Sequence, residues 1–262
     1  MLTLMIGACV GLVLGLTGAG GGILAIPALT LGLGWSVTQA TPIALLAVGG
    51  AALLGAIYGL RQGLVRYKAA ATMACAGWLV APLGLYLAQQ VAGDVLMLMF
   101  GMVMLMVAGR MYWQARHVRD ESQGTLQRNC MLDPATGRLD WNARCLATLA
   151  AIGGASGFLT GLLGVGGGFL IVPAFRKFSD VRMHGVVATS LMVVALVSLG
   201  TLAHLFSRGL VLEPAGASFI GAALCGMIGG RWLAPKISAL LLQQLFALLC
   251  VAVSLLMISK GL

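Results

Sequence analysis

Residues 11–29 read GLVLGLTGAGGGILAIPAL, and residues 157–175 read GFLTGLLGVGGGFLIVPAF. At an offset of 146, ten of these nineteen positions are identical. The identical positions include Gly18, Gly20, Gly21, Gly22 and Pro27 in the first copy, and Gly164, Gly166, Gly167, Gly168 and Pro173 in the second. The same offset matches residues 62–65 with 208–211, whereas matching Thr41 to Thr189 needs a two-residue slip. An internal repeat decides the architecture, so we expect two related halves.

The composition around these segments is that of a membrane protein. Of the 262 residues, 60% are apolar and 9% are charged, whereas soluble domains have about 45–50% apolar and about 25% charged residues. The first charged side chain is Arg61, and a spanning helix needs only ~20 apolar residues. Apolar segments cover 2–34, 38–60, 69–91, 95–109, 145–175, 185–206, 215–234 and 239–259. The sequence therefore predicts an all-α polytopic membrane protein.

The positive charges select between two topologies. If all eight segments span, the 16 Lys and Arg residues divide 11 to 5 between the two faces. If segments 2–34 and 145–175 instead enter and leave on one side, 14 of them share a face and only Arg208 and Lys260 lie opposite. The positive-inside rule favours the second arrangement and makes that face cytoplasmic. Eight full spans, or a continuous tilted broken helix, remain the alternatives.

Segment length supports the same arrangement. A helix over residues 2–34 would be about 50 Å long, too long for a ~30 Å hydrocarbon core, while the pieces on either side of each glycine cluster look too short to span. We therefore expect a first repeat at 1–109, a cytoplasmic connector at 110–144 and a second repeat at 145–262. Each repeat would hold a re-entrant hairpin and three transmembrane helices. Three is an odd number, so the halves would be inverted repeats, as in many secondary transporters.

The glycine clusters carry the main chemical signal. Four glycines in five positions disfavour a helix by ~1 kcal/mol each relative to alanine. Non-helical backbone inside a membrane is tolerated only where it is buried in protein or lines a wet cavity. The helix that follows each break has free N–H groups with a partial positive charge, and glycine lets a ligand approach them. We therefore expect a shared anion site at Gly18, Gly20, Gly21, Gly22, Gly164, Gly166, Gly167 and Gly168. The alternative is that the glycines only allow close helix packing.

The acids argue against other functions. None of the seven acids lies within an apolar segment, although cation sites and proton relays in membranes usually use a buried carboxylate. Their positions therefore argue against a cation transporter.

The six cysteines form no metal-binding pattern and are interpreted mostly as small apolar residues, so neither a metal nor a cofactor is expected. Lys and Arg fall between apolar segments, where they set topology rather than bind nucleic acid. No serine pairs convincingly with a membrane histidine, so we expect no enzyme.

The remaining polar candidates are hydroxyl groups and one histidine. Thr17 and Thr160 flank the two breaks and could donate to an anion. Thr41, and Thr189 with Ser190, fall at predicted helix starts, where they would cap the helix or contact an anion; capping is the favoured reading. His204 lies within segment 185–206 and would either move a proton or take an interfacial structural role, the second being favoured.

The two glycine-rich segments, together with QATPIALLAV at 39–48 and VVATSLMVVALVSL at 186–199, resemble the sulfite exporter TauE/SafE family. The resemblance covers both halves. It implies a multi-pass protein of the bacterial inner membrane that exports sulfite or a small sulfonate, with the glycine breaks and the surroundings of Thr41 and Thr189 lining the path. A small anion and the bilayer would be its partners; a homo-oligomer is left open. Two rivals are a passive anion channel and a membrane scaffold that holds a partner enzyme through 110–144.

Overall fold

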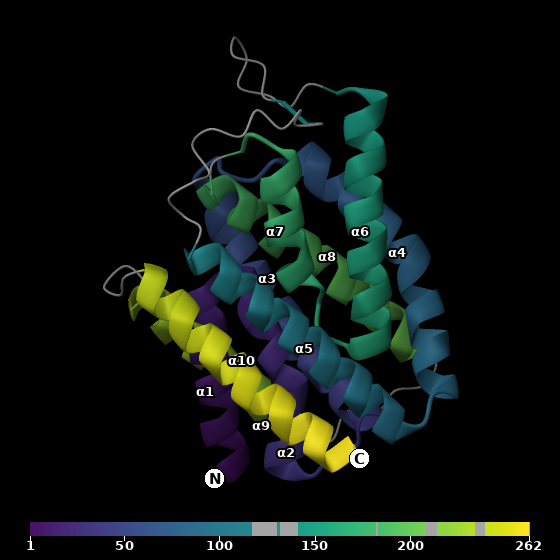
Figure 1. Ribbon diagram of the computed structural model, residues 1–262, viewed down its shortest axis with the longest axis vertical. Coiled ribbons are helices and arrows are strands. Elements are labelled where there is room, and N and C mark those ends of the chain that lie inside the picture. Colours follow the sequence, from purple (N-terminus) through teal and green to yellow (C-terminus); the bar gives the residue numbers. More distant parts are fainter. Residues whose placement is uncertain (117–129, 132–140, 182, 208–213, 234–238, 262) are drawn as a thin grey trace.

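The computed structural model describes residues 1–116, 130–131, 141–181, 183–207, 214–233 and 239–261 (Figure 1). Every predicted apolar segment is helical, and the two segments with glycine clusters are each divided into two helices. The elements are α1 (Leu2–Thr17), the 3-10 helix η1 (Gly18–Leu24), α2 (Ala25–Leu33), α3 (Val37–Arg61), α4 (Tyr67–Gln90), α5 (Gly93–Arg116), α6 (Ala143–Leu163), α7 (Gly168–Phe178), α8 (Met183–Ser207), α9 (Pro214–Leu233) and α10 (Ala239–Gly261).

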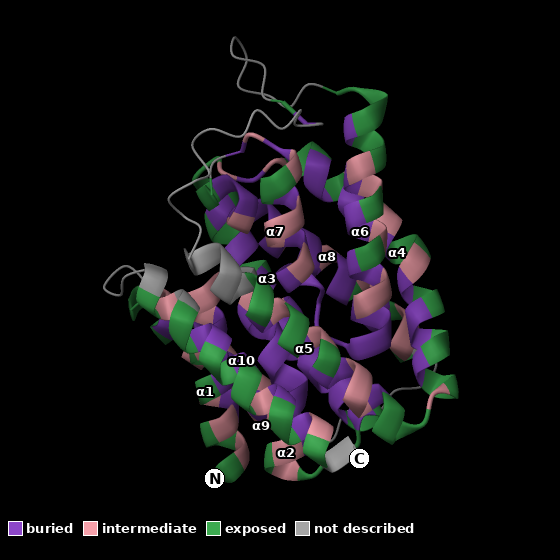
Figure 2. Cartoon of the chain, in the orientation of Figure 1, coloured by how far each residue is buried: buried purple, intermediate pink, exposed green. Residues whose placement is uncertain are grey.

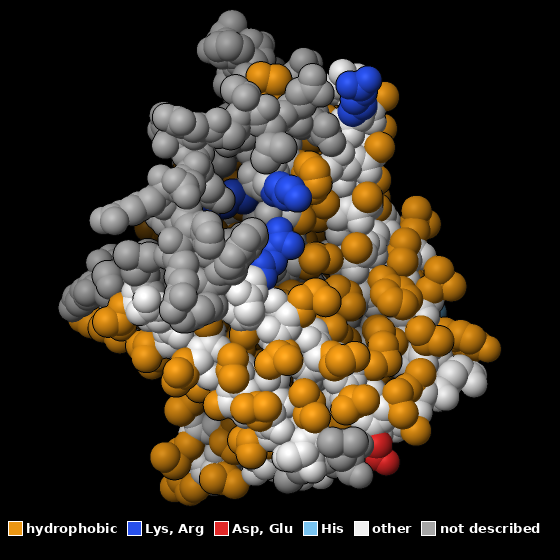
Figure 3. Space-filling view, in the orientation of Figure 1, with side chains coloured by type: hydrophobic (Ala, Val, Ile, Leu, Met, Phe, Trp, Pro, Cys, Tyr) orange, Lys and Arg blue, Asp and Glu red, His pale blue; other side chains and the backbone are white. Residues whose placement is uncertain are grey.

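The helices have the length and surface of membrane spans. Within the described residues, α3, α4, α6, most of α8 and the first 18 residues of α5 are long and apolar enough to cross a bilayer. Large apolar side chains point outward, including Leu79, Met106 and Leu248, each more than 70% exposed. In Figure 3 apolar side chains cover the middle and lower part of the face drawn, while the Lys and Arg side chains gather towards its upper end. The prediction of a polytopic all-helical membrane protein is confirmed.

Both glycine-broken segments turn back towards the end where they begin. A Cβ placed on Gly32, near the end of α2, would lie 2.7 Å from Cδ1 of Ile6, near the start of α1. In the second segment, Cys130 is joined to Cys145 at the start of α6 and forms a β-bridge with Ser179 after α7. The first hairpin opens at the lower end of the molecule in Figure 1 and the second at the upper end. The expectation that each piece beside a glycine cluster is too short to span is wrong for α6, which has 21 residues and is long enough to span by itself.

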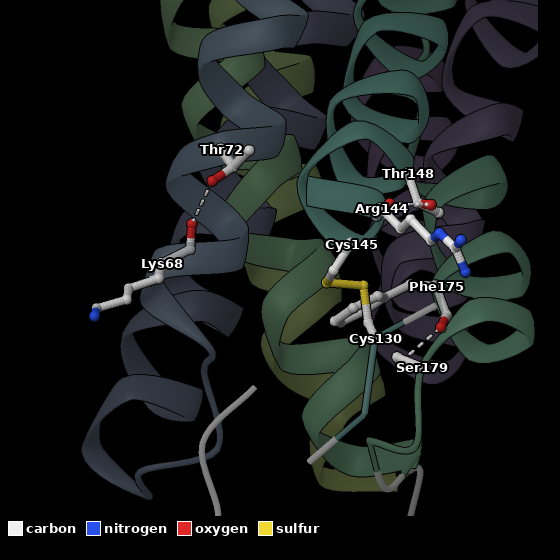
Figure 4. The surroundings of a disulfide bond; sticks show 8 residues. All are labelled: Lys68, Thr72, Cys130, Arg144, Cys145, Thr148, Phe175 and Ser179. Carbon is white, nitrogen blue, oxygen red and sulfur yellow. Dashed lines mark hydrogen bonds between the residues drawn. A yellow bond between two sulfur atoms is a disulfide. The ribbon is translucent and has the colours of Figure 1, made fainter. Parts of the chain in front are cut away.

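A disulfide closes the second hairpin (Figure 4). The amide N–H of Cys130 donates to the carbonyl of Phe178 at 3.0 Å, and its carbonyl accepts from the amide of Asp180 at 3.3 Å. The reading of the cysteines as small apolar residues did not anticipate this bond. The remainder of the predicted connector, residues 117–129 and 132–140, lies outside the described residues, as do most of the acids, Arg208 and the side chain of Lys260.

The helices pair across the two halves. The closest pairs are α4 with α6, α1 with α9, α5 with α10 and α3 with α8. In two of them a stripe of helical glycines lets the backbones touch. The contacts correspond at the offset of 146: Gly7 with Phe219, Gly11 with Ala223 and Gly15 with Met227 match Gly153 with Met73, Gly157 with Gly77 and Gly161 with Ala81. A twofold axis between the halves would produce this pairing, so it supports the inverted repeat, which stays a prediction.

The offset of 146 also relates the starts of two pairs of helices. α3 and α8 begin at Val37 and Met183, and α5 and α10 begin at Gly93 and Ala239. The side chain of Thr41 lies against Gly164 as that of Val187 lies against Gly18. The counterpart of Thr41 is therefore Val187, and the two-residue slip that paired it with Thr189 is wrong. The two-residue shift came from a local sequence identity between residues 40–41 and 188–189. The helix starts and the contacts instead keep the offset of 146.

Buried residues gather at the centre of the molecule, around α3, α7 and α8, and exposed residues follow the outer faces of α4, α5 and α10 (Figure 2). The second helix break lies within this buried centre, and the first lies at its border.

Candidate functional site

The second break is an irregular turn that only glycine can form. α6 ends at Leu163, and Gly164, Gly166 and Gly167 have φ of 65°, 75° and 60° before α7 begins at Gly168. Side chains other than glycine rarely adopt these values because Cβ then meets the neighbouring carbonyl oxygen. Residues 160–169 are all buried. The amide groups at the start of α7 therefore lie deep inside the protein.

The first break has a different shape. Gly18, with φ of 71°, ends α1, and the chain continues as the 3-10 helix η1 before α2 begins at Ala25. Thr17, Gly18 and Gly20 are partly exposed, and a Cβ on Gly20 would have no atom of the described residues within 4 Å. The first break is thus partly open, while the second is enclosed.

The two breaks meet between α3 and α8. A Cβ on Gly22 would lie 3.0 Å from the carbonyl oxygen of Val165 and 2.8 Å from Val48 of α3. A Cβ on Gly166 would lie 3.1 Å from the same Val48 and 2.9 Å from Val194 of α8. The predicted glycines are therefore neighbours in space. Positive φ at four of them and the open position of Gly20 give these glycines a backbone role beyond the helix packing that Gly7, Gly11 and their counterparts serve.

Two predicted hydroxyls lie beside the breaks, and both donate to their own helix. Thr17 Oγ1 donates to the carbonyl of Val13 at 2.8 Å and lies next to Gly21. Thr41 Oγ1 donates to the carbonyl of Val37 at 2.7 Å and lies next to Gly164. The capping prediction is wrong for Thr41, since α3 is capped by a reciprocal pair of bonds between Ser36 and Gln39.

The other predicted hydroxyls are also hydrogen-bonded to backbone groups. Thr189 Oγ1 accepts a 3.0 Å hydrogen bond from the amide of Arg66, so it serves the start of α4 rather than that of its own helix. Ser190 Oγ donates to the carbonyl of Val187 at 2.8 Å. Thr160 Oγ1 donates to the carbonyl of Ser156 at 2.8 Å within α6.

His204 belongs to a separate cavity. A cavity of about 350 Å³ lies between α4 and α8, with Trp78, Pro82, Thr201 and His204 in its wall. The indole N–H of Trp78 donates to the carbonyl of Leu196 at 2.7 Å and holds the two helices together there. His204 is six residues beyond Ser198 on α8, or ~9 Å along the helix axis, so it does not face the glycine breaks directly.

Sequence reasoning missed two serines. Ser156 of α6 and Ser198 of α8 are fully buried, and their hydroxyls lie against Gly167 and Gly166 of the second break. A lone serine in an apolar segment carries no signal in itself. The repeat did hold a signal, because the offset of 146 sets Ser156 opposite Val10 and Ser198 opposite Ala52.

The fold and the site define a multi-pass α-helical membrane protein in which two interrupted helices meet at the centre. The chain matches the family model described as "Sulfite exporter TauE/SafE" over residues 3–257. It belongs to this family, and it is a membrane transporter.

Two curated relatives, both called "Probable membrane transporter protein", come from Xylella fastidiosa strains Temecula1 / ATCC 700964 and 9a5c. Each is 32% identical over 265 residues, which cover 100% of this chain and 95% of the relative. A bacterial inner-membrane location agrees with these relatives. No solved structure matches the chain.

Proposed function

We propose that this transporter moves a small sulfur-containing oxyanion, sulfite or a small organosulfonate, and binds it between the two glycine breaks. The observation that carries the proposal is the contact of the breaks, with Gly22 against Val165 and both Gly22 and Gly166 against Val48. The start of α7 lies at this contact, and its first amides offer hydrogen-bond donors and partial positive charge to a solute.

The chemistry of the centre supports an anion rather than a cation. The buried polar residues near the breaks are hydroxyl-bearing, and the carboxylates fall outside the predicted apolar segments. Cation sites in membranes usually contain an acidic side chain. Binding by neutral donors also leaves the centre uncharged when the anion departs, which suits a carrier that must reorient empty.

The sulfur oxyanion and the outward direction follow the family description, "Sulfite exporter TauE/SafE". In a carrier with inverted halves, one half would rock against the other around the breaks, so that the site opens to each side in turn.

Uptake of labelled sulfite into proteoliposomes tests the proposal. The informative variant is Gly20→Val, because a Cβ there has no atom of the described residues within 4 Å, and we expect the fold to be kept. Gly229→Val of α9 is the matched control, since its Cβ also meets no atom of the described residues. We expect saturable uptake that falls about tenfold or more in Gly20→Val, the effect of ~1.4 kcal/mol, and stays unchanged in Gly229→Val. Absence of sulfite uptake by the wild type, or equal uptake by both variants, would contradict the proposal.

A further inference from the structure

Two buried hydroxyls in the centre of the protein are unsatisfied. Ser156 and Ser198 are 0% exposed, and neither Oγ has a hydrogen-bond partner within the described residues. Nearly all buried polar atoms in proteins are hydrogen-bonded, so an exception calls for an explanation. Other buried hydroxyls follow the rule by donating to a carbonyl of their own helix, as Thr201 of α8 does to Val197 and Ser254 of α10 to Val251.

Both hydroxyls lie beside the same turn. A Cβ placed on Gly167 would collide with Ser156 Oγ, and a Cβ on Gly166 would lie 3.6 Å from Ser198 Oγ, which also lies 3.3 Å from the Cβ position of Gly49 on α3. The two serines come from different helices, α6 and α8, yet converge on the two glycines that precede α7. Only glycine at position 167 lets the Ser156 hydroxyl come this close to the backbone of the turn.

The turn also presents backbone donors. α7 has 11 residues and begins at Gly168, directly after Gly166 and Gly167. The first amide N–H groups of a helix lack partners inside that helix and carry partial positive charge. In α7 the amides of Leu170 and Ile171 donate to the carbonyl of Gly167, which leaves those of Gly168 and Phe169. The unsatisfied hydroxyls and these amides form one cluster of donors, and the natural ligand of such a cluster is a group with several acceptor oxygens.

The first break has no equivalent cluster. At the offset of 146, Ser156 corresponds to Val10 and Ser198 to Ala52. The other hydroxyls around the second break, Thr41 and Thr160, correspond to Val187 and Leu14. The hydroxyl beside the first break, that of Thr17, donates to Val13. The repeat therefore keeps the glycines in both halves, while the two unsatisfied hydroxyls lie at the second break.

We propose that the hydroxyls of Ser156 and Ser198, with the amides at the start of α7, bind the oxygen atoms of the transported anion, while the first break closes over it with apolar surface. This proposal rests on the proposed function and assigns its site to the second break. A pyramidal oxyanion offers separate acceptor oxygens to these donors, whereas a halide is a single spherical acceptor, so chloride is the comparison anion in the test.

The test uses the full-length protein in proteoliposomes, with labelled sulfite and labelled chloride as probes. Ser156→Ala and Ser198→Ala are compared with Ser254→Ala, whose hydroxyl is buried but bonded within α10. We expect the KM for sulfite to rise about tenfold or more in each of the first two variants, as for a lost hydrogen bond to a charged group. The control should stay within about twofold of the wild type. Ser198→Thr, which keeps a hydroxyl, should recover part of the loss.

Thermal stability in detergent separates ligand binding from a structural role. Removing an unsatisfied hydroxyl should leave the unfolding temperature without sulfite unchanged or higher, and should reduce the stabilisation that sulfite adds. If the hydroxyls only held a structural water, the variants would be less stable and their KM for sulfite unchanged, which would overturn the proposal. Wild-type protein that fails to transport sulfite would instead overturn the proposed function itself, and saturable sulfite uptake with unaltered KM in both variants would overturn this inference alone.

Discussion

The two glycine breaks share most of their sequence and differ in almost everything that surrounds them. The first break continues as a 3-10 helix and is partly exposed, with Gly20 facing open space. The second is a buried turn of three glycines with positive φ, and two unsatisfied serine hydroxyls lie against it. The two halves therefore have corresponding helix contacts, while their breaks differ in exposure and in the polar groups around them.

The comparison also separates two uses of glycine. The stripes on α1 and α6 serve helix packing in both halves, and their contacts repeat pair by pair at the offset of 146. The glycines of the breaks serve backbone conformation, and here the halves diverge. The helix contacts of the stripes therefore correspond in the two halves, whereas the two unsatisfied hydroxyls lie at the second break.

The largest expected effect comes from a side chain at the second break. Gly166→Val forces a branched residue to a φ of 75° and sets its Cβ 2.9 Å from Val194. Backbone strain of this kind costs ~1–3 kcal/mol before the collision is counted, so we expect little folded protein in the membrane. Size-exclusion chromatography of a fluorescent fusion measures this. Gly20→Val, the corresponding change in the first break, should give a normal peak; equal loss in both variants would remove the distinction between the breaks.

The second-largest expected effect concerns how the two hairpins are closed. The second is closed by the bond between Cys130 and Cys145, which are 15 residues apart, and the first by contact of Ile6 with Gly32. A disulfide across such a loop stabilises by about 3 kcal/mol. Cys145→Ser should therefore lower the unfolding temperature of oxidised protein, and reductant should bring the wild type to the same value. Ile6→Ala is the matched change in the first hairpin, and its effect should not depend on reductant.

The same cysteines test the predicted topology. Disulfides are rare in the cytoplasm, so a cytoplasmic connector predicts that a membrane-permeant maleimide labels Cys130 and Cys145 in unfolded protein from growing cells without prior reduction. Labelling that requires reduction first would put the connector on the oxidising side and reverse the topology.

A smaller effect is expected at Thr41. Its hydroxyl lies beside Gly164, but its proton is donated to Val37. Thr41→Val keeps the shape of the side chain, so the KM for sulfite should change by less than about threefold, against tenfold for Ser198→Ala. Uptake assays on the two variants side by side measure the difference. A larger effect in Thr41→Val than in Ser198→Ala would indicate that Thr41 of α3, rather than Ser198, binds the anion.

The smallest effect is expected when a hydroxyl is added to the first break. Ala52 is the buried counterpart of Ser198. In Ala52→Ser the new hydroxyl can donate to the carbonyl of Val48 within its own helix, so uptake and stability should match the wild type. A lower KM for sulfite would indicate that the first break also contacts the anion.

The sequence was sufficient for the helices and insufficient for the polar contacts. Long apolar segments marked every helix, and the glycine clusters marked both breaks, since these features act locally. The length of α6, the partner of Thr189 and the capping of α3 by Ser36 were missed because they depend on where each helix begins and what packs against it. Ser156 and Ser198 were missed because their importance arises from the absence of a partner, which becomes visible only once neighbours are known.

The most direct test is a structure determined with bound selenite, a pyramidal oxyanion whose selenium can be located by anomalous scattering. We predict one selenium peak at the second break, with its oxygens at hydrogen-bonding distance, ~2.7–3.2 Å, from the hydroxyls of Ser156 and Ser198 and the first amides of α7. A peak confined to the cavity of Trp78 and His204, with the two breaks still in direct contact, would contradict the account.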